Sequence, residues 1–326
     1  MKLISPPYRN GLALVFIITV ISYLISQQFG AISPLTAGLV IALIVSNLIN
    51  LPQSIAPGAI FASKALMRTG IVLLGLRISY GQVAEVGLAG LVLVVCVVVG
   101  TFFGALLLGK ALKISTNTSI LVGAGFAICG NTAIAAISPT INAKREETAY
   151  AVGLVTLFGT LSIATLPVIG GLLNLTEARF GAWAGAAVHD VGQVIATAEI
   201  VGGAALAVAV IVKLTRMLLL APMLIALSAK FNSQNGAKLK SSIPPFILLF
   251  ILVLSINSAV ELPTTIINTG KTAATLLLTA GITGMGLGVK WRSLVAVGGR
   301  PLILASLAWV VVAFVSLGLI VVLNVA

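Results

Sequence analysis

His189 and Asp190 stand side by side in an apolar stretch, and they are the only histidine and the only aspartate of the chain. An ionisable group inside a hydrophobic segment is costly unless it faces a partner or a water-filled cavity, so the pair indicates a functional position. Because imidazole titrates near neutral pH, we predict that the two side chains couple a proton or Na⁺ to the function. The structural alternative is that Asp190 caps a helix and His189 hydrogen-bonds a carbonyl.

A second polar group interrupts an alanine-rich run at Gly130, Asn131 and Thr132. Glycine lets the backbone turn and approach a ligand closely, while the amide and the hydroxyl that follow can donate to an oxyanion. Gln193 comes three residues after Asp190, which places both on one helix face. We predict that Gly130, Asn131, Thr132 and Gln193 contact a small anionic substrate. A packing seam of small residues is the alternative.

Four cations lie inside apolar segments, as the pairs Lys64 with Arg68 and Lys213 with Arg216. Spacings of four and three residues place each pair on one helix face. A cation near a segment end can extend to the lipid headgroups, and Lys64 is interpreted in that way. Arg68 and Arg216 lie deeper, and we predict that their guanidinium groups bind the anion or pair with a buried carboxylate.

The composition places these residues in a membrane protein. Hydrophobic residues make up 59% of the 326 residues and charged residues only 8%, unlike a soluble domain. The formal net charge is +12, but Lys and Arg fall at the edges of apolar runs, which argues against a nucleic-acid partner. Cys96 and Cys129 both lie within apolar runs, so the sequence predicts no disulfide, no metal site and no cofactor.

About eleven apolar segments follow one another, which predicts an all-α polytopic membrane protein with a single transmembrane domain over 1–326. The segments are 12–29, 35–49, 61–76, 83–108, 119–141, 148–173, 181–202, 205–229, 243–259, 272–289 and 301–323. A cytoplasmic N-terminus and a periplasmic C-terminus place most loop cations in the cytoplasm, as the positive-inside rule requires. The cytoplasmic set includes Lys2, Lys238, Lys240 and Arg292.

Two of these segments, 119–141 and 181–202, are rich in glycine, alanine and polar residues. Backbone that leaves the helical conformation at membrane depth is tolerated where protein surrounds it. We predict that both segments are discontinuous or re-entrant. A broken helix presents free N–H groups and a positive dipole end, which attract an anion.

An internal repeat appears when the sequence is shifted by 211 residues. The shift superposes Pro34 on Pro245, Leu51-Pro52 on Leu262-Pro263, Gly70-Ile71 on Gly281-Ile282 and Val86-Gly87 on Val297-Gly298. We predict repeat units at approximately 34–112 and 245–323, in opposite orientations because an odd number of crossings separates them. Inverted repeats with broken helices are the recurrent architecture of secondary transporters.

Four motifs are specific enough to indicate a family: GIVLLGLRIS at 70–79, ICGNTAIAA at 128–136, AAVHDVGQVIA at 186–196 and KLTRMLLLAP at 213–222. They resemble the YeiH-type bacterial membrane proteins, for which sulfate export has been suggested. The resemblance covers most of the chain from about Leu66 onward. It implies an inner-membrane protein similar to bile-acid symporters and sodium/proton antiporters, with an inverted-repeat core and a panel domain.

These observations predict a secondary transporter, not an enzyme, that exports a small oxyanion such as sulfate, sulfite or a sulfonate by alternating access. Its partners are then the anion, a coupling proton or Na⁺, and the lipid bilayer, and a homodimer is one assembly to consider. The alternatives are a cation/proton antiporter, an anion sensor, and an intramembrane enzyme with a His189–Asp190 dyad. In the enzyme, Cys129 would be the available thiol.

Overall fold

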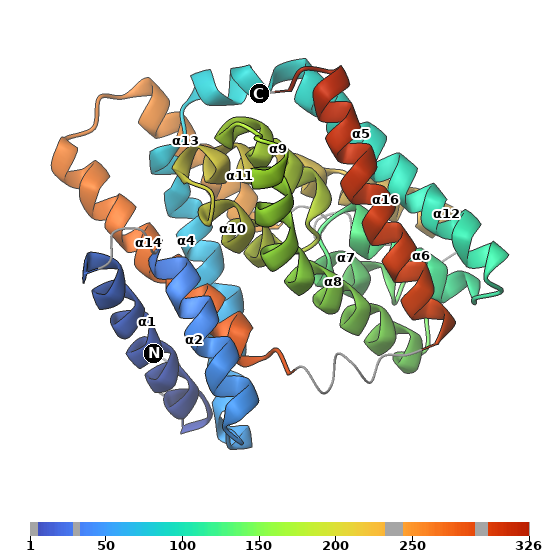
Figure 1. The fold of residues 1–326 in the computed structure, drawn as a ribbon, viewed down its shortest axis with the longest axis horizontal. Coiled ribbons are helices and arrows are strands. Elements are labelled where there is room, and N and C mark those ends of the chain that lie inside the picture. The colour runs from blue at the N-terminus through green and yellow to red at the C-terminus, as the bar shows by residue number, and fades with distance from the viewer. Residues whose placement is uncertain (1–5, 29–32, 232–243, 291–298, 326) are drawn as a thin grey trace. The chain divides into compact units, whose positions relative to one another are not determined.

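The computed structural model describes residues 6–28, 33–231, 244–290 and 299–325. This part of the chain consists of helices and short connections without a β-strand, as the sequence predicted (Figure 1). Six of its helical stretches are long and apolar enough to cross a membrane: Tyr8–Gln28, Gln53–Arg77, Val86–Ala111, Arg145–Leu172, Gly203–Lys230 and Arg300–Val322. Lys2, Lys238, Lys240 and Arg292, together with Val297 and Gly298 of the predicted repeat, lie outside the described residues.

The chain divides into two compact units. Unit 1 comprises Met1–Gly81 and Pro245–Ser293, and unit 2 comprises Gln82–Pro244 and Leu294–Ala326. Both units are therefore built from sequence-distant parts of the chain.

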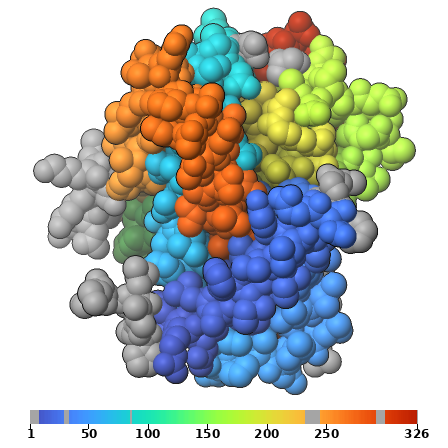
Figure 2. Space-filling view, turned by 90° about the vertical axis from the view of Figure 1, so that its left-hand side faces the viewer, coloured from blue at the N-terminus to red at the C-terminus, as the bar shows by residue number. Residues whose placement is uncertain are grey.

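Unit 1 contains α1, α2, α3, α4, α13 and α14. Their bounds are Pro6–Gln28, Pro34–Leu48, Ala56–Phe61, Met67–Leu74, Pro245–Ala259 and Thr264–Leu287. A π-helical turn, Ala62–Leu66, joins α3 to α4, and short 3₁₀ turns extend this stretch from Gln53 to Arg77. Figure 2 shows a face of this unit on which α14, in orange, lies beside α1 and α2, in blue.

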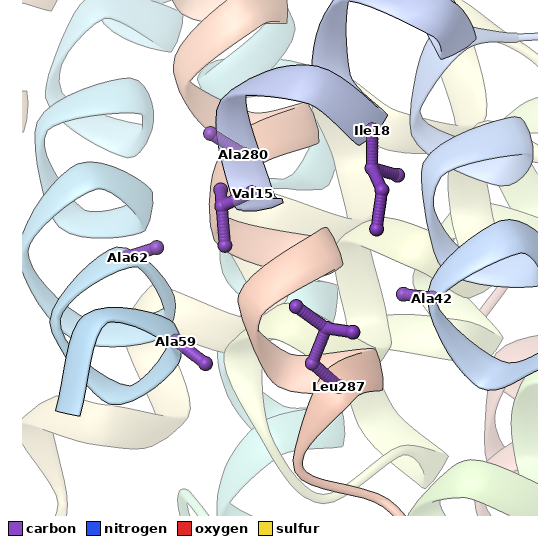
Figure 3. Close-up of a cluster of buried hydrophobic side chains, with 7 residues drawn as sticks. All are labelled: Val15, Ile18, Ala42, Ala59, Ala62, Ala280 and Leu287. Atoms are coloured by element: carbon purple, nitrogen blue, oxygen red, sulfur yellow. The ribbon is translucent and has the colours of Figure 1, made fainter. Parts of the chain in front are cut away.

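Small residues let the helices of unit 1 pack closely. One buried cluster combines three larger aliphatic side chains with four alanines, each alanine from a different helical element (Figure 3). Its residues are Val15, Ile18, Ala42, Ala59, Ala62, Ala280 and Leu287. A Cβ atom on Gly58 would lie only 2.6 Å from the Cα of Gly11. The backbones of α1 and α3 thus touch, as is common for helix pairs in membranes.

Unit 2 contains α6 to α12 and α16, and most of α5 (Tyr80–Ala111). The bounds are Thr116–Ala127, Asn131–Ile137, Arg145–Leu172, Glu177–Ala187, Val191–Glu199, Gly203–Leu218, Leu220–Lys230 and Arg300–Val322. α9 packs along α11, while α8 contacts both α6 and α10 (Figure 1). The breaks between α6 and α7 and between α9 and α10 lie within the two segments that the sequence predicted to be discontinuous.

Candidate functional site

The two interrupted helices of unit 2 touch each other at their breaks. Residues 128–130 separate α6 from α7, and residues 188–190 separate α9 from α10; we call these six residues the crossing. A Cβ atom on Gly130 would lie 3.3 Å from the Cβ of Asp190 and 3.4 Å from its Cα. The crossing therefore brings the two polar motifs of the sequence into direct contact.

Local chemistry explains why both helices break at these positions. Gly130 adopts φ +62° and ψ −126°, a conformation that residues with a side chain rarely adopt. The carboxylate of Asp190 accepts a hydrogen bond from the Gly192 N–H at 3.0 Å, and the Asp190 N–H donates to Gln193 Oε1 at 3.2 Å. This capping box starts α10, so Asp190 acts at least as a helix cap.

Lys213 caps the carboxyl ends of both broken helices. Its ammonium group donates to the carbonyls of Ile128 at 2.6 Å and Val188 at 3.0 Å, and also to the carbonyl of His189. The last carbonyls of a helix lack intrahelical partners and carry the negative end of the helix dipole, so a cation stabilises them. Lys213 is fully buried.

Arg216 continues the same cap one turn further along α11. Its Nε and Nη2 donate to carbonyls at the end of α6, with distances of 2.7 to 3.0 Å to Phe126 and Ala127. Its Nη1 donates to the carbonyls of Gly185, Ala186 and Val188 at 2.6 to 3.1 Å. Arg216 is fully buried, and all three of its nitrogens are engaged by the protein backbone.

The charges at the crossing add up to a positive excess. Lys213 donates to three carbonyl acceptors, a geometry that suits its ammonium form, and a guanidinium keeps its charge in proteins. Asp190, which interacts with Lys213 electrostatically, supplies one negative charge when ionised. Two cations against one carboxylate favour an anion in a poorly screened environment.

His189 is fully buried, and its ring packs on Phe126 with a centroid distance of 4.0 Å. The imidazole has one weak hydrogen-bonding interaction, with the Phe126 backbone, and neither ring nitrogen forms a hydrogen bond of good geometry with a described residue. Buried polar atoms are nearly always hydrogen-bonded in native proteins, so such exceptions require an explanation. The imidazole is thus a polar group with hydrogen-bonding capacity to spare.

Asn131 and Thr132 begin α7 beside the break, and both are half-buried, as is Asp190. Asn131 Nδ2 lies 3.5 Å from Thr156 Oγ1, whereas the buried Asn131 Oδ1 forms no hydrogen bond with a described residue. These three side chains form the more accessible edge of the crossing. An oxyanion that reached this edge would be met by the donors, the Asn131 amide N–H and the Thr132 hydroxyl, because the Asn131 Oδ1 and the Asp190 carboxylate only accept hydrogen bonds.

Gln193 is oriented by the protein on both sides of its amide. Oε1 accepts from the Asp190 N–H, while Nε2 donates to the Thr156 carbonyl at 3.3 Å and lies 3.5 Å from Thr160 Oγ1. Gly159 on α8 leaves space for the Gln193 amide, because a Cβ atom at position 159 would overlap it. Gln193 therefore links the start of α10 to α8.

The structure brings together seven of the predicted site residues in unit 2: Gly130, Asn131, Thr132, His189, Asp190, Gln193 and Arg216. Arg216 faces backbone carbonyls, so its donors are not free to bind a substrate. Arg68 belongs to unit 1, where its exposed guanidinium lies 5.7 Å from the Phe246 ring centroid. Lys213 was not predicted as a site residue, although its position three residues before Arg216 in one apolar segment was the available signal.

A metal centre finds no support in the described part of the chain, where no three His, Cys, Asp or Glu side chains cluster. Cys129 lies in the 128–130 segment of the crossing and His189 in the 188–190 segment. Both side chains are buried.

Comparison with known proteins identifies the family. The family described as Conserved hypothetical protein 698 matches residues 10–305. A UPF0324 membrane protein of Corynebacterium glutamicum is 39% identical over 91% of this chain and 88% of its own length. A UPF0324 membrane protein of Pseudomonas aeruginosa is 36% identical, covering 87% and 85%. The UPF0324 inner membrane protein YeiH of Escherichia coli K12 is 35% identical, covering 86% and 83%. The chain is thus a membrane protein of the conserved hypothetical protein 698 family, to which its YeiH-type motifs pointed.

Proposed function

We propose that the chain is a secondary transporter of the bacterial inner membrane that moves a small oxyanion by alternating access. The observation that carries the proposal is the crossing, where two broken helices meet beside two buried cations and one carboxylate. Secondary transporters commonly bind their substrates between discontinuous helices near the bilayer midplane. The positive excess favours an anion over a cation, which counts against a cation/proton antiporter.

The bounds of the helices support an inverted repeat. α2 and α13 each have 15 residues and start at Pro34 and Pro245, which are 211 positions apart. The same offset relates Gln53, where the third helical stretch starts, to Thr264, where α14 starts. It also relates Ala111 at the end of α5 to Val322 at the end of α16.

Contacts within unit 1 support opposite orientations of the two copies. A Cβ atom on Gly70 would lie 2.8 Å from Leu278, and one on Gly281 would lie 2.6 Å from Met67. Gly70 and Gly281 are equivalent under the shift, and so are Met67 and Leu278. Such an exchange of partners is the signature of two-fold symmetry. The antiparallel run continues to Gly284, which meets Ala62.

Each residue of the proposed site has a distinct role. His189 and Asp190 exchange the coupling ion, a proton or Na⁺, while the Asn131 amide and the Thr132 hydroxyl donate to the anion. Gly130, whose N–H donates to the Gly125 carbonyl, provides the turn that brings them to it. Gln193 orients Asp190, and Arg216 contributes charge without touching the substrate. We further propose a cytoplasmic N-terminus, with unit 2 as the transporter core and unit 1 as the panel.

Flux into proteoliposomes tests this function. Purified protein is reconstituted, and counterflow of radiolabelled sulfate, sulfite and taurine is measured against protein-free vesicles. We expect saturable uptake of at least one of these anions, and loss of most of it in Asp190→Asn. Uptake of none of them, together with cation-driven proton flux, would favour the antiporter. The Cys129→Ser variant should retain flux, whereas an enzyme that used this thiol would lose its activity.

A further inference from the structure

We infer that the Lys213 ammonium occupies the position that a coupling Na⁺ would take. The crossing then binds no Na⁺, and the transport cycle does not require Na⁺ to bind at this position. This inference rests on the proposed function and narrows its choice of coupling ion. It starts from the carbonyls that Lys213 and Arg216 contact.

The carboxyl ends of broken helices are ready-made cation sites. In secondary transporters, unwound carbonyls and half-helix carboxyl ends coordinate the coupling cation, because several partial negative charges converge there. Here the Ile128 carbonyl follows α6, and the carbonyls of Val188 and His189 follow α9. All three point at one atom, the Nζ of Lys213. A covalently attached cation therefore fills the place where the two helix ends converge.

The surrounding carbonyls are engaged as well. Arg216 donates to Phe126 and Ala127 on the α6 side and to Gly185 and Ala186 on the α9 side. A Na⁺ ion would have to displace an ammonium from three carbonyls and remain beside a guanidinium. Repulsion by two fixed like charges in a poorly screened interior opposes both steps. Lys213 and Arg216 thus supply the positive charge that stabilises the carboxyl ends of α6 and α9, and no mobile cation is needed there.

The proposed test uses sodium-dependent stability, which does not depend on knowing the substrate. Thermal unfolding of the purified full chain in detergent is followed in NaCl and in choline chloride at equal ionic strength. We expect the same Tm for the wild-type protein in both salts. In Lys213→Ala, the three carbonyls and Asp190 form an open cation site, so NaCl should raise Tm by about 3 °C, increasingly with concentration.

Two further variants complete the experiment. Lys230→Ala removes an exposed lysine from the end of the same helical stretch and should show no response to Na⁺. Lys213→Gln keeps an N–H donor but no charge, and it replaces Lys213→Ala if the alanine variant does not fold. Ethylammonium should raise the Tm of Lys213→Ala and leave that of the wild-type protein unchanged.

Stabilisation of the wild-type protein by Na⁺ would overturn the inference, and so would Lys213 variants that respond to neither Na⁺ nor ethylammonium. These outcomes are distinguishable from failure of the proposed function. If Na⁺ stabilises the wild-type protein and anion flux is present, only the inference about Lys213 is rejected. Absent flux with Na⁺-independent wild-type stability and the expected variant response rejects only the transporter.

Discussion

Gly130 and Asp190 lie against each other in unit 2, although they belong to different broken helices. The contact joins the residue that allows the first break to the residue that caps the helix after the second. Because Gly130 sets the backbone conformation of the first break and the Asp190 carboxylate caps the helix after the second, changes on either side should alter the geometry of the whole crossing.

Gly130→Ala tests that contact. An alanine would have to adopt a positive φ and place its Cβ 3.3 Å from that of Asp190, so we expect destabilisation of about 1 to 3 kcal/mol. The change is measured as the loss of Tm of the purified protein, and flux should fall as well. Gly100→Ala is the control, because nothing lies within 4 Å of a Cβ there and the helix should tolerate it. Equal Tm values for the two variants would contradict the role of the Gly130 conformation.

Gly159→Ala tests the link from α8 to Asp190. The added methyl group overlaps the Gln193 amide, which must move and release its hydrogen bonds to Asp190 and Thr156. We expect a loss of about 1 to 3 kcal/mol of stability and a strong loss of flux. Gly171→Ala on the same helix has open space around its Cβ and should behave like the wild-type protein. Retained flux in Gly159→Ala would show that the position of Gln193 is not needed.

His189→Phe separates packing from proton exchange. Phenylalanine can keep the contact with Phe126 but is larger than the imidazole at this fully buried position, so we expect a smaller loss of Tm than in His189→Ala. Flux should nevertheless be lost if the imidazole exchanges the coupling proton. His189→Ala is the comparison, and it should lower both, because it also leaves a cavity. Normal flux in His189→Phe would leave the imidazole with a packing role alone.

Arg216→Met should be the most destabilising of these changes. It removes the three donor nitrogens that contact five buried backbone carbonyls, of which Val188 keeps the Lys213 ammonium as a donor. A loss of about 3 to 5 kcal/mol is expected, enough to prevent recovery of folded protein. The fraction of monodisperse protein in detergent measures the effect. Arg300→Met is the control at an exposed helix start. A monodisperse, stable Arg216→Met variant would mean that the carbonyls are satisfied in another way.

Thiol labelling at Arg68 tests whether the face of unit 1 around this residue is lined by water. Its exposed guanidinium lies well inside the 25-residue stretch Gln53–Arg77, a depth at which contact with lipid is costly. We expect Arg68→Cys, made in a Cys96→Ser background, to react with a membrane-impermeant thiol reagent. Ile60→Cys, which replaces an exposed apolar residue of the same stretch, should react far more slowly. Equal rates would argue against a water-lined face at Arg68.

The local features of the site could be predicted from the sequence. Gly130 and Asp190 break their helices for reasons that reside in the residues themselves, a positive φ and a capping box. The family motifs and the 211-residue repeat are likewise patterns of residue type and spacing. The predicted helix breaks and the family are confirmed, while the repeat stays a prediction. The breaks could be predicted because helix formation and helix termination depend on near neighbours in the chain.

The tertiary structure decided what the in-span cations contact. The sequence showed that Lys213 and Arg216 share a helix face, and Arg216 was expected to meet a substrate or a carboxylate. Their acceptors are backbone carbonyls, which every residue carries, so no residue type marks them in the sequence. Only the folded chain brings the ends of α6 and α9 to α11, and it leaves Arg68 in unit 1. The sequence alone determined where the helices break, and long-range packing determined which charges stabilise the breaks.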